Sequence, residues 1–167
     1  MIIVLFGQPH SGKTTLADEL QKQLFLTEQK AYPVVDGDEI RKLFKNKDYS
    51  REGRIKNLNR ISEISTFLAT KLELVIVAAV YPIKEAREYF ESIHDEIVWV
   101  YLTYEGNRGR EEFHVKDYEL PSGELKNIIK INTSQDEISK CVNKIFSFYW
   151  SVSGSARGTQ ISVQEED

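Results

Sequence analysis

The residues with the clearest chemical meaning lie near the start of the chain, in the sequence Gly7-Gln8-Pro9-His10-Ser11-Gly12-Lys13-Thr14. This is a complete G-x-x-x-x-G-K-T motif between an apolar run and a helical pattern, which is the setting of a phosphate-binding loop. Its main-chain N–H groups and the positive end of the following helix would surround a phosphate. Lys13 would contact the outer phosphates of ATP and the Thr14 hydroxyl would ligate Mg²⁺. His10 occupies a variable position, where a filler is favoured over a proton-transfer role.

Two carboxylates follow the second apolar run, in Asp36-Gly37-Asp38. One interpretation is an Asx turn with a helix N-cap, since Asp is common at both. The other is catalytic: one carboxylate holds a metal-bound water and the other accepts the proton of an acceptor hydroxyl. Beside a phosphate-binding loop, the catalytic interpretation is favoured.

Other nucleotide-binding classes fit less well. A GTPase needs an Asn-Lys-x-Asp guanine reader after a late strand, whereas Asn46-Lys47-Asp48 has the wrong spacing and comes too early. Many ATPases have a strand that ends in Asp, whereas the third apolar run here continues into Val80-Tyr81-Pro82. A kinase that acts on a small hydroxyl acceptor remains.

These residues need a scaffold of alternating strands and helices. Strands are predicted over residues 2–6, 32–35, 74–80, 97–102 and 128–131, and helices from Lys13, over 39–44, over 50–73, over 84–93 and over 134–148. This alternation predicts a three-layer α/β/α P-loop NTPase fold with a mainly parallel five-stranded sheet. The carboxyl ends of such strands hold the ligand.

Apolar periodicity predicts which helix faces are buried. The first helix repeats Leu16, Leu20 and Leu24, and the longest repeats Ile55, Leu58, Ile61, Ile64, Leu68 and Leu72. Ser50 is a candidate N-cap for the longest helix. Ser134-Gln135-Asp136-Glu137 has the form of a capping box for the last helix, whose buried face would hold Ile138, Val142 and Ile145.

Composition limits the partners. The chain has 167 residues, a formal net charge of −4 and one cysteine, Cys141. We expect a kinase domain over residues 1–150 and a flexible tail over 151–167, with small nucleotides as partners, no general nucleic-acid binding and no membrane. No signal peptide is recognisable, so a cytoplasmic location is expected.

Three strings give a more specific indication. They are Val35 to Arg41, Tyr49 to Arg60 and Tyr81 to Arg87, and in this order they resemble the successive motifs of the adenylylsulfate kinases over about residues 1–150. That resemblance implies phosphorylation of the 3′-hydroxyl of adenosine 5′-phosphosulfate by MgATP, and leaves a homodimer possible. It also implies a lid over about residues 104–121.

The motif and the resemblance together assign roles to residues. Lys13, Asp36 and Asp38 would be catalytic, with Thr14 on the metal side. The resemblance places Asp36 on the metal side and Asp38 as general base, while the residues themselves leave open which of the two carboxylates takes the proton. The residues assigned to ATP are Gly7, Gln8, Pro9, His10, Ser11, Gly12, Lys13, Thr14, Thr15 and Arg108. Those assigned to the acceptor are Asp38, Arg41, Arg54, Asn57, Val80, Tyr81, Lys84 and Phe113. Arg54 and Asn57 would share a helix face, where Arg suits a sulfate or phosphate and Asn suits a base edge.

Several positions depart from the family pattern. Tyr81 stands where Ser is usual, Lys84 replaces an Arg, Gly53 an Asp, and Asn59 an Arg. The lid is shortened relative to the family, and its Arg108 and Arg110 either reach the transferring phosphoryl group or pair with Glu111 and Glu112. Two alternatives therefore stay open: a kinase for a nucleoside, a polynucleotide 5′-end or a sugar, and a nucleotide-binding module without turnover.

Overall fold

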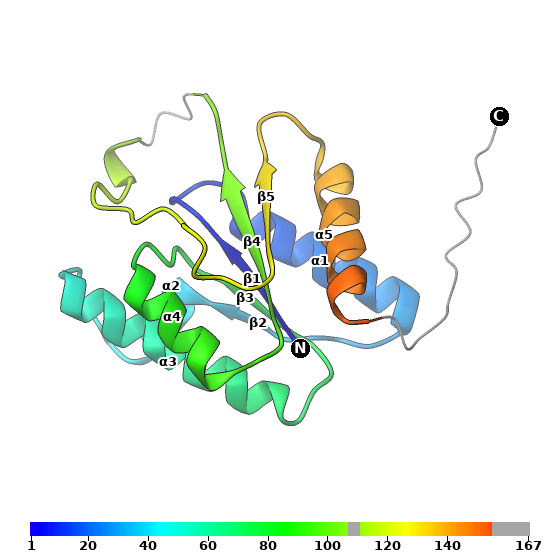
Figure 1. Ribbon diagram of the computed structural model, residues 1–167, viewed down its shortest axis with the longest axis horizontal. Coiled ribbons are helices and arrows are strands. Elements are labelled where there is room, and N and C mark those ends of the chain that lie inside the picture. Colours follow the sequence, from blue (N-terminus) through cyan, green and yellow to red (C-terminus); the bar gives the residue numbers. More distant parts are fainter. Residues whose placement is uncertain (107–110, 155–167) are drawn as a thin grey trace.

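The computed structural model describes residues 1–106 and 111–154, and within them a parallel sheet is covered by helices on both faces (Figure 1). Its strand order is β2-β3-β1-β4-β5, and every neighbouring pair is parallel. The strands are β1 (Ile2–Phe6), β2 (Val34–Asp36), β3 (Val75–Ala78), β4 (Ile97–Thr103) and β5 (Ile128–Asn132). The predicted three-layer fold with a five-stranded sheet is confirmed.

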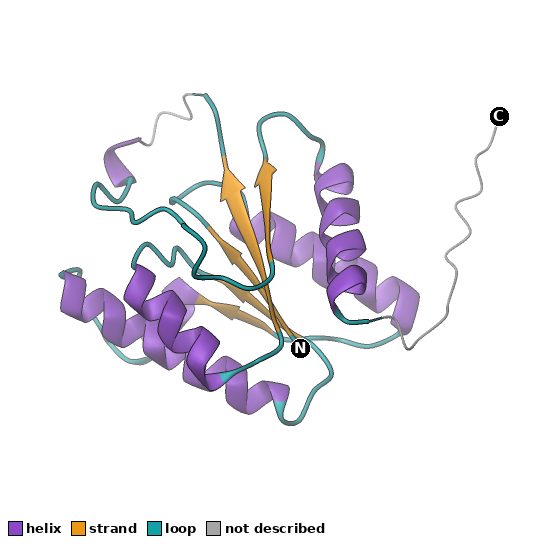
Figure 2. Cartoon of the chain, viewed as in Figure 1, coloured by secondary structure: helices purple, strands orange, loops and turns teal. Residues whose placement is uncertain are grey.

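The helices divide into two layers (Figure 2). The five α-helices are α1 (Lys13–Glu28), α2 (Gly37–Leu43), α3 (Arg51–Ala69), α4 (Lys84–Ile93) and α5 (Ile138–Val152), and a 3₁₀ turn, η1, spans Glu111–Phe113. Helices α1 and α5 cover one face of the sheet, and α2, α3 and α4 lie on the other (Figure 1). No helix in the described ranges combines the length and hydropathy that a membrane crossing requires.

The apolar character of β1 follows from this double cover. Ile3 and Leu5 pack in the core on the side of α1 and α5, whereas Ile2, Val4 and Phe6 pack in the core on the side of α3 and α4. All five side chains are fully buried, because alternate side chains of a strand point to opposite faces and both faces are covered.

The capping residue and the apolar periodicity correctly predicted the start of α3 and the buried face of α1. The Ser50 side chain accepts a hydrogen bond from the N–H of Gly53, as an N-cap of α3 should. Leu16, Leu20 and Leu24 are buried as predicted. Helix α3 ends at Ala69, however, and Leu72 lies beyond it with 37% of its surface exposed.

The predicted start of the last helix was wrong. The Ser134 hydroxyl donates to Asn132 Oδ1 at 2.5 Å and accepts from the N–H of Glu105, so it belongs to a turn after β5. Helix α5 instead begins at Ile138, with Glu137 as an N-cap that makes no side-chain bond. Ile138 is 48% exposed rather than buried, while Val142 and Ile145 are buried as expected.

The end of α5 also differs from the prediction. The helix continues to Val152, so the first two residues of the expected tail are helical. Residues 153 and 154 form a turn, and the tail from residue 155 onward lies outside the described residues.

Candidate active site

The phosphate-binding loop depends on two glycines with unusual backbone angles. Gly7 has φ 147°, and a Cβ atom there would lie 2.2 Å from the carbonyl oxygen of Leu102. Gly12 has φ 96° and forms the N-cap of α1. Other residues rarely adopt these angles, so the glycines permit the turn from β1 into α1.

Lys13 reaches back over this loop. Its Nζ donates to the carbonyl oxygens of Gly7 at 3.2 Å and Gln8 at 2.7 Å. Burial lowers the pKa of Lys13 to about 8, although the carboxylates of Asp38 and Asp36 act in the opposite direction. The ammonium therefore lies between the phosphate-binding loop and the two carboxylates.

Asp36 and Asp38 have different surroundings. Asp36 Oδ1 accepts from the N–H of Asp38 at 2.8 Å and of Glu39 at 3.2 Å, so Asp36 is the N-cap of α2. The N-cap predicted as one alternative for this motif is therefore present, and it uses one of the two carboxylate oxygens of Asp36. Within the described ranges, no side chain or N–H bonds its other oxygen or the Asp38 carboxylate.

One cavity of about 990 Å³ collects most of the predicted site residues. Its lining includes the loop, the end of β3 and the facing sides of α2 and α3. The predicted residues that line it are Pro9, His10, Gly12, Lys13, Thr14, Thr15, Asp36, Asp38, Arg41, Arg54, Asn57, Val80 and Phe113. Nucleotide-binding and acceptor-binding candidates therefore share one space.

Two arginines of the cavity lining lie close to the aromatic ring of Tyr49. The guanidinium carbon of Arg41 lies 4.3 Å from the centre of the Tyr49 ring, and that of Arg54 lies 5.6 Å from it. Arg41 also donates to the Asp48 carbonyl at 2.8 Å, and Arg54 to the Tyr49 carbonyl at 2.9 Å. These bonds hold both cations at the cavity wall.

Tyr49 also lines the cavity, and we did not predict it as a site residue. In the sequence Tyr49 stands between Arg41 and Arg54, but the approach of both side chains to its ring depends on the loop that joins α2 to α3.

Asn57 presents an unused acceptor. The side chain is only 4% exposed, and its Nδ2 donates to the Gly37 carbonyl at 3.3 Å. In the part of the chain that the structure describes, its buried Oδ1 has no partner. A buried polar atom of this kind favours a ligand that donates a hydrogen bond.

Tyr81 and Lys84 do not reach the cavity. The backbone turns at Tyr81 with φ 44°, and its side chain is fully buried, with the hydroxyl 2.9 Å from Ser62 Oγ. Lys84 pairs with Glu88 at 3.5 Å on α4. Both side chains were expected at the acceptor, and the structure places them elsewhere.

The remaining candidates divide into two groups. Gly7, Gln8 and Ser11 belong to the loop but are not part of the cavity lining. Arg108 lies outside the described residues, as does Arg110.

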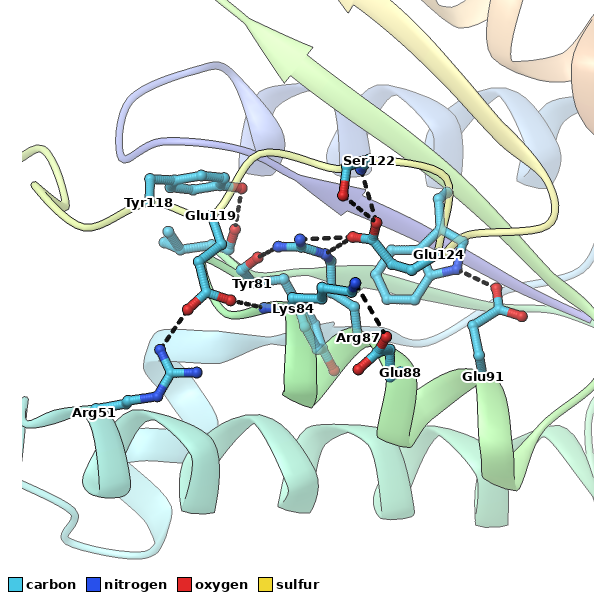
Figure 3. Close-up of polar contacts among 12 residues, drawn as sticks. Arg51, Tyr81, Lys84, Arg87, Glu88, Glu91, Tyr118, Glu119, Ser122 and Glu124 are labelled. Carbon is cyan, nitrogen blue, oxygen red and sulfur yellow. Dashed lines mark hydrogen bonds and ion pairs between the residues drawn. The ribbon is translucent and has the colours of Figure 1, made fainter.

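A buried ion pair, which no motif or spacing had indicated, supports the turn at Tyr81 (Figure 3). The fully buried Arg87 of α4 donates to Glu124 Oε1 at 2.9 and 2.7 Å, and to the Tyr81 carbonyl at 2.8 Å. Glu124 also accepts from the N–H of Ser122 at 2.7 Å. The pair thus joins the end of β3 to the segment between β4 and β5.

Comparisons with known proteins agree with this architecture. The family model described as adenylylsulphate kinase matches residues 1–136. An adenylyl-sulfate kinase of Oceanobacillus iheyensis is 34% identical over 99 residues, which are 58% of this chain and 49% of that protein. One of Clostridium kluyveri is 28% identical over 171 residues, covering 89% of this chain and 82% of that protein. The chain therefore spans about half the length of the first of these relatives.

Solved structures show the same fold. The APS kinase of Mycobacterium tuberculosis, in complex with AMPPNP and APS, is similar with a TM-score of 0.73 and 20% identity, covering 88% of this chain and 95% of that one. A gluconokinase from Sinorhizobium meliloti is similar with a TM-score of 0.63 and 17% identity, covering 92% and 93%. The fold is thus shared among kinases with different acceptors, while the family model matches most of the sequence. This chain belongs to the adenylylsulphate kinase family.

Proposed function

We propose that this protein transfers the γ-phosphoryl group of ATP to the 3′-hydroxyl of adenosine 5′-phosphosulfate. The observation that carries the proposal is that one cavity is lined both by Lys13 and Thr14 of the loop and by Asp38, Arg41 and Asn57. A kinase needs both substrates in one space, because positioning and charge stabilisation provide most of its catalysis.

The phosphate-binding loop would hold the triphosphate. Its main-chain N–H groups and the N-terminus of α1 attract negative charge. Lys13 adds an ammonium group, which would exchange its bonds to the Gly7 and Gln8 carbonyls for bonds to phosphate oxygens.

The residues present also suit Mg²⁺. Thr14 offers an exposed hydroxyl, and Asp36 offers the oxygen that does not cap α2. In the described ranges no three His, Cys, Asp or Glu side chains cluster as a metal site, so phosphate oxygens and water would complete the ligand set, as Mg²⁺ commonly requires. When bound, the ion would neutralise charge on the β- and γ-phosphates.

The rest of the cavity lining suits an anionic nucleotide. Arg41 and Arg54 present cations that can pair with a phosphate or sulfate. Phe113 is 58% exposed at the cavity and offers a face for a purine ring, as does Tyr49. Asn57 Oδ1 would accept a hydrogen bond from the base or the ribose. We also propose that the lid expected over about residues 104–121, of which residues 107–110 lie outside the described residues, covers the acceptor.

Asp38 would act as the general base. Its carboxylate accepts the proton of the acceptor hydroxyl while that oxygen forms a bond to the γ-phosphorus. The bond between this phosphorus and the β,γ-bridging oxygen breaks, and ADP leaves. Lys13 would stabilise the charge that develops on the transferring group.

An acceptor panel tests the proposal. The protein would be incubated with ATP that carries a radiolabel in its γ-phosphate and with one acceptor at a time: adenosine 5′-phosphosulfate, adenosine, gluconate or an oligonucleotide with a 5′-hydroxyl. We expect label on adenosine 5′-phosphosulfate and no transfer by a Lys13→Ala variant. Transfer to another acceptor alone would identify a different kinase, and ATP binding without any transfer would indicate a nucleotide-binding module.

A further inference from the structure

The side chain of Gln8 bonds to a segment far along the chain. Its Nε2 donates to the Val115 carbonyl at 3.0 Å, and its Oε1 accepts from the N–H of Val115 at 2.9 Å. The amide thus pairs with one residue's main chain as a neighbouring strand would. Both bonds are partly buried, where competition from water is reduced.

Val115 belongs to a segment, residues 113–119, that we term the strap. Its other end is bonded to the turn after β3 (Figure 3). That turn also contributes to the cavity lining. The Tyr118 hydroxyl donates to the Val80 carbonyl at 2.8 Å, and the N–H of Glu119 donates to the Pro82 carbonyl at 2.8 Å. The strap is therefore attached to the phosphate-binding loop at one point and to the end of β3 at two.

The Glu119 carboxylate adds side-chain support at that second end. It accepts from the N–H of Lys84 at 2.6 Å and is paired with Arg51 (Figure 3). Lys84 and Arg51 are the first residues of α4 and α3. This end of the strap thus contacts two helix N-termini, whereas Gln8 supplies the bonds at the other end.

The strap contributes two residues to the cavity lining, Phe113 and Val115. Phe113 also meets the loop directly, because its ring centre lies 6.0 Å from that of His10 with the rings nearly perpendicular. The Gln8 side chain itself does not line this cavity. Gln8 therefore acts on this cavity only through the strap that its side chain holds.

We propose that Gln8 is a positioning residue for the acceptor: its side chain fixes the strap, and thereby Phe113, against the phosphate-binding loop. This rests on the proposed function, because it assigns Phe113 to the acceptor nucleotide. In this proposal the main chain of Gln8 is part of the loop that binds the phosphates of ATP, and its side chain positions the strap for the acceptor. Removing the side-chain amide should weaken acceptor binding and leave ATP binding unchanged.

A Gln8→Leu variant tests this, because leucine keeps a similar volume and removes both bonds. Gln21→Leu is the matched control: Gln21 Nε2 donates to the Tyr32 carbonyl at 2.6 Å, away from the cavity. We expect Gln8→Leu to raise KM for adenosine 5′-phosphosulfate about tenfold and to change KM for ATP by less than about twofold. Gln21→Leu should leave both constants unchanged.

Hydrogen exchange gives a second readout that needs no substrate. The Val115 amide should exchange about tenfold faster in Gln8→Leu than in the unmodified protein or in Gln21→Leu. Faster exchange with an unchanged acceptor KM would overturn the positioning role, and so would an equal rise in both KM values. If the unmodified protein did not phosphorylate adenosine 5′-phosphosulfate, the proposed function would be wrong. An unchanged exchange rate would separately refute the attachment of the strap.

Discussion

The protonation of Lys13 should make the affinity for ATP depend on pH. In the nucleotide-free protein burial lowers its pKa to about 8, and the negative charge of a bound triphosphate would raise it. At pH values below about 8 Lys13 is protonated with or without nucleotide, so affinity should not depend on this group. Above about 8 the free protein loses the proton and must regain it on binding.

ATP affinity should therefore fall as the pH rises above about 8, by up to about tenfold per pH unit. Titration calorimetry between about pH 7 and about pH 10 would measure it. Lys13→Arg is the control, since arginine stays charged over this range. A decline of equal steepness in that variant would assign the effect to another group.

Replacing Asp36 and Asp38 by Asn, one at a time, should have different effects on catalysis. Asp38→Asn removes the proposed base, so kcat should fall about 10²- to 10⁴-fold while the Kd of ATP changes little. Asp36→Asn keeps a good N-cap, so the melting temperature should be retained, and a higher Mg²⁺ concentration should be needed for half-maximal rate. Nearly full kcat in Asp38→Asn would exclude it as the base.

At the scale of residues, the phosphate-binding end was predictable because its geometry is set by eight contiguous residues. The bond between Gln8 and Val115 was not, because 107 positions separate them. Tyr81 illustrates a further limit: its place in the string suggested the acceptor, whereas its positive φ accompanies a side chain in the core. A sequence pattern does not report that angle for a non-glycine residue.

At the scale of elements, the pair of Arg87 and Glu124 holds α4 against the segment before β5. Both side chains are almost completely removed from solvent, at 0% and 4% exposure. Arg87 also bonds the carbonyl of Tyr81, whose backbone conformation is unfavourable for an aromatic residue. The pair should therefore matter for stability through both the ion pair and the turn.

Arg87→Met should lower the free energy of unfolding by about 3–5 kcal/mol, because it leaves Glu124 buried without its partner. Urea denaturation would measure this. The double variant Arg87→Met with Glu124→Met should recover much of the loss, since a paired apolar replacement leaves no buried charge.

Lys30→Met is the matched surface control. Lys30 pairs with Glu73 at 2.7 Å, with about half of each side chain exposed. Its loss should cost less than about 1 kcal/mol. An equal cost for the Arg87 and Lys30 variants would contradict a structural role for the buried pair.

Element prediction succeeded where one local signal dominated and failed where two competed. Ser50 had no rival and caps α3 as predicted. Ser134 begins a sequence with the form of a capping box, but its hydroxyl donates a hydrogen bond to Asn132, two residues earlier. The turn after β5 thus satisfies the serine before α5 begins.

At the scale of the whole molecule, the parallel sheet explains why distant motifs meet. Asp36 ends β2, Val80 follows β3 and the phosphate-binding loop follows β1. These three strands are adjacent in the order β2-β3-β1, so their carboxyl ends share one edge of the sheet. The alternation of strands and helices predicted this edge. The connection between β4 and β5 completes the cavity, and its long-range bonds lie beyond the reach of periodicity.

Because one folded unit holds both ends of the cavity, each ligand should stabilise the whole chain. A nucleotide analogue at about a hundred times its Kd should add about 2.7 kcal/mol to the free energy of unfolding, which raises the melting temperature by several degrees. Lys13→Ala should lose the increment from AMPPNP and keep that from adenosine 5′-phosphosulfate, whereas Arg54→Met should show the reverse. Thermal melts of the two variants with each ligand would measure this crossed pattern. Loss of both increments in both variants would mean that the two ends do not bind independently.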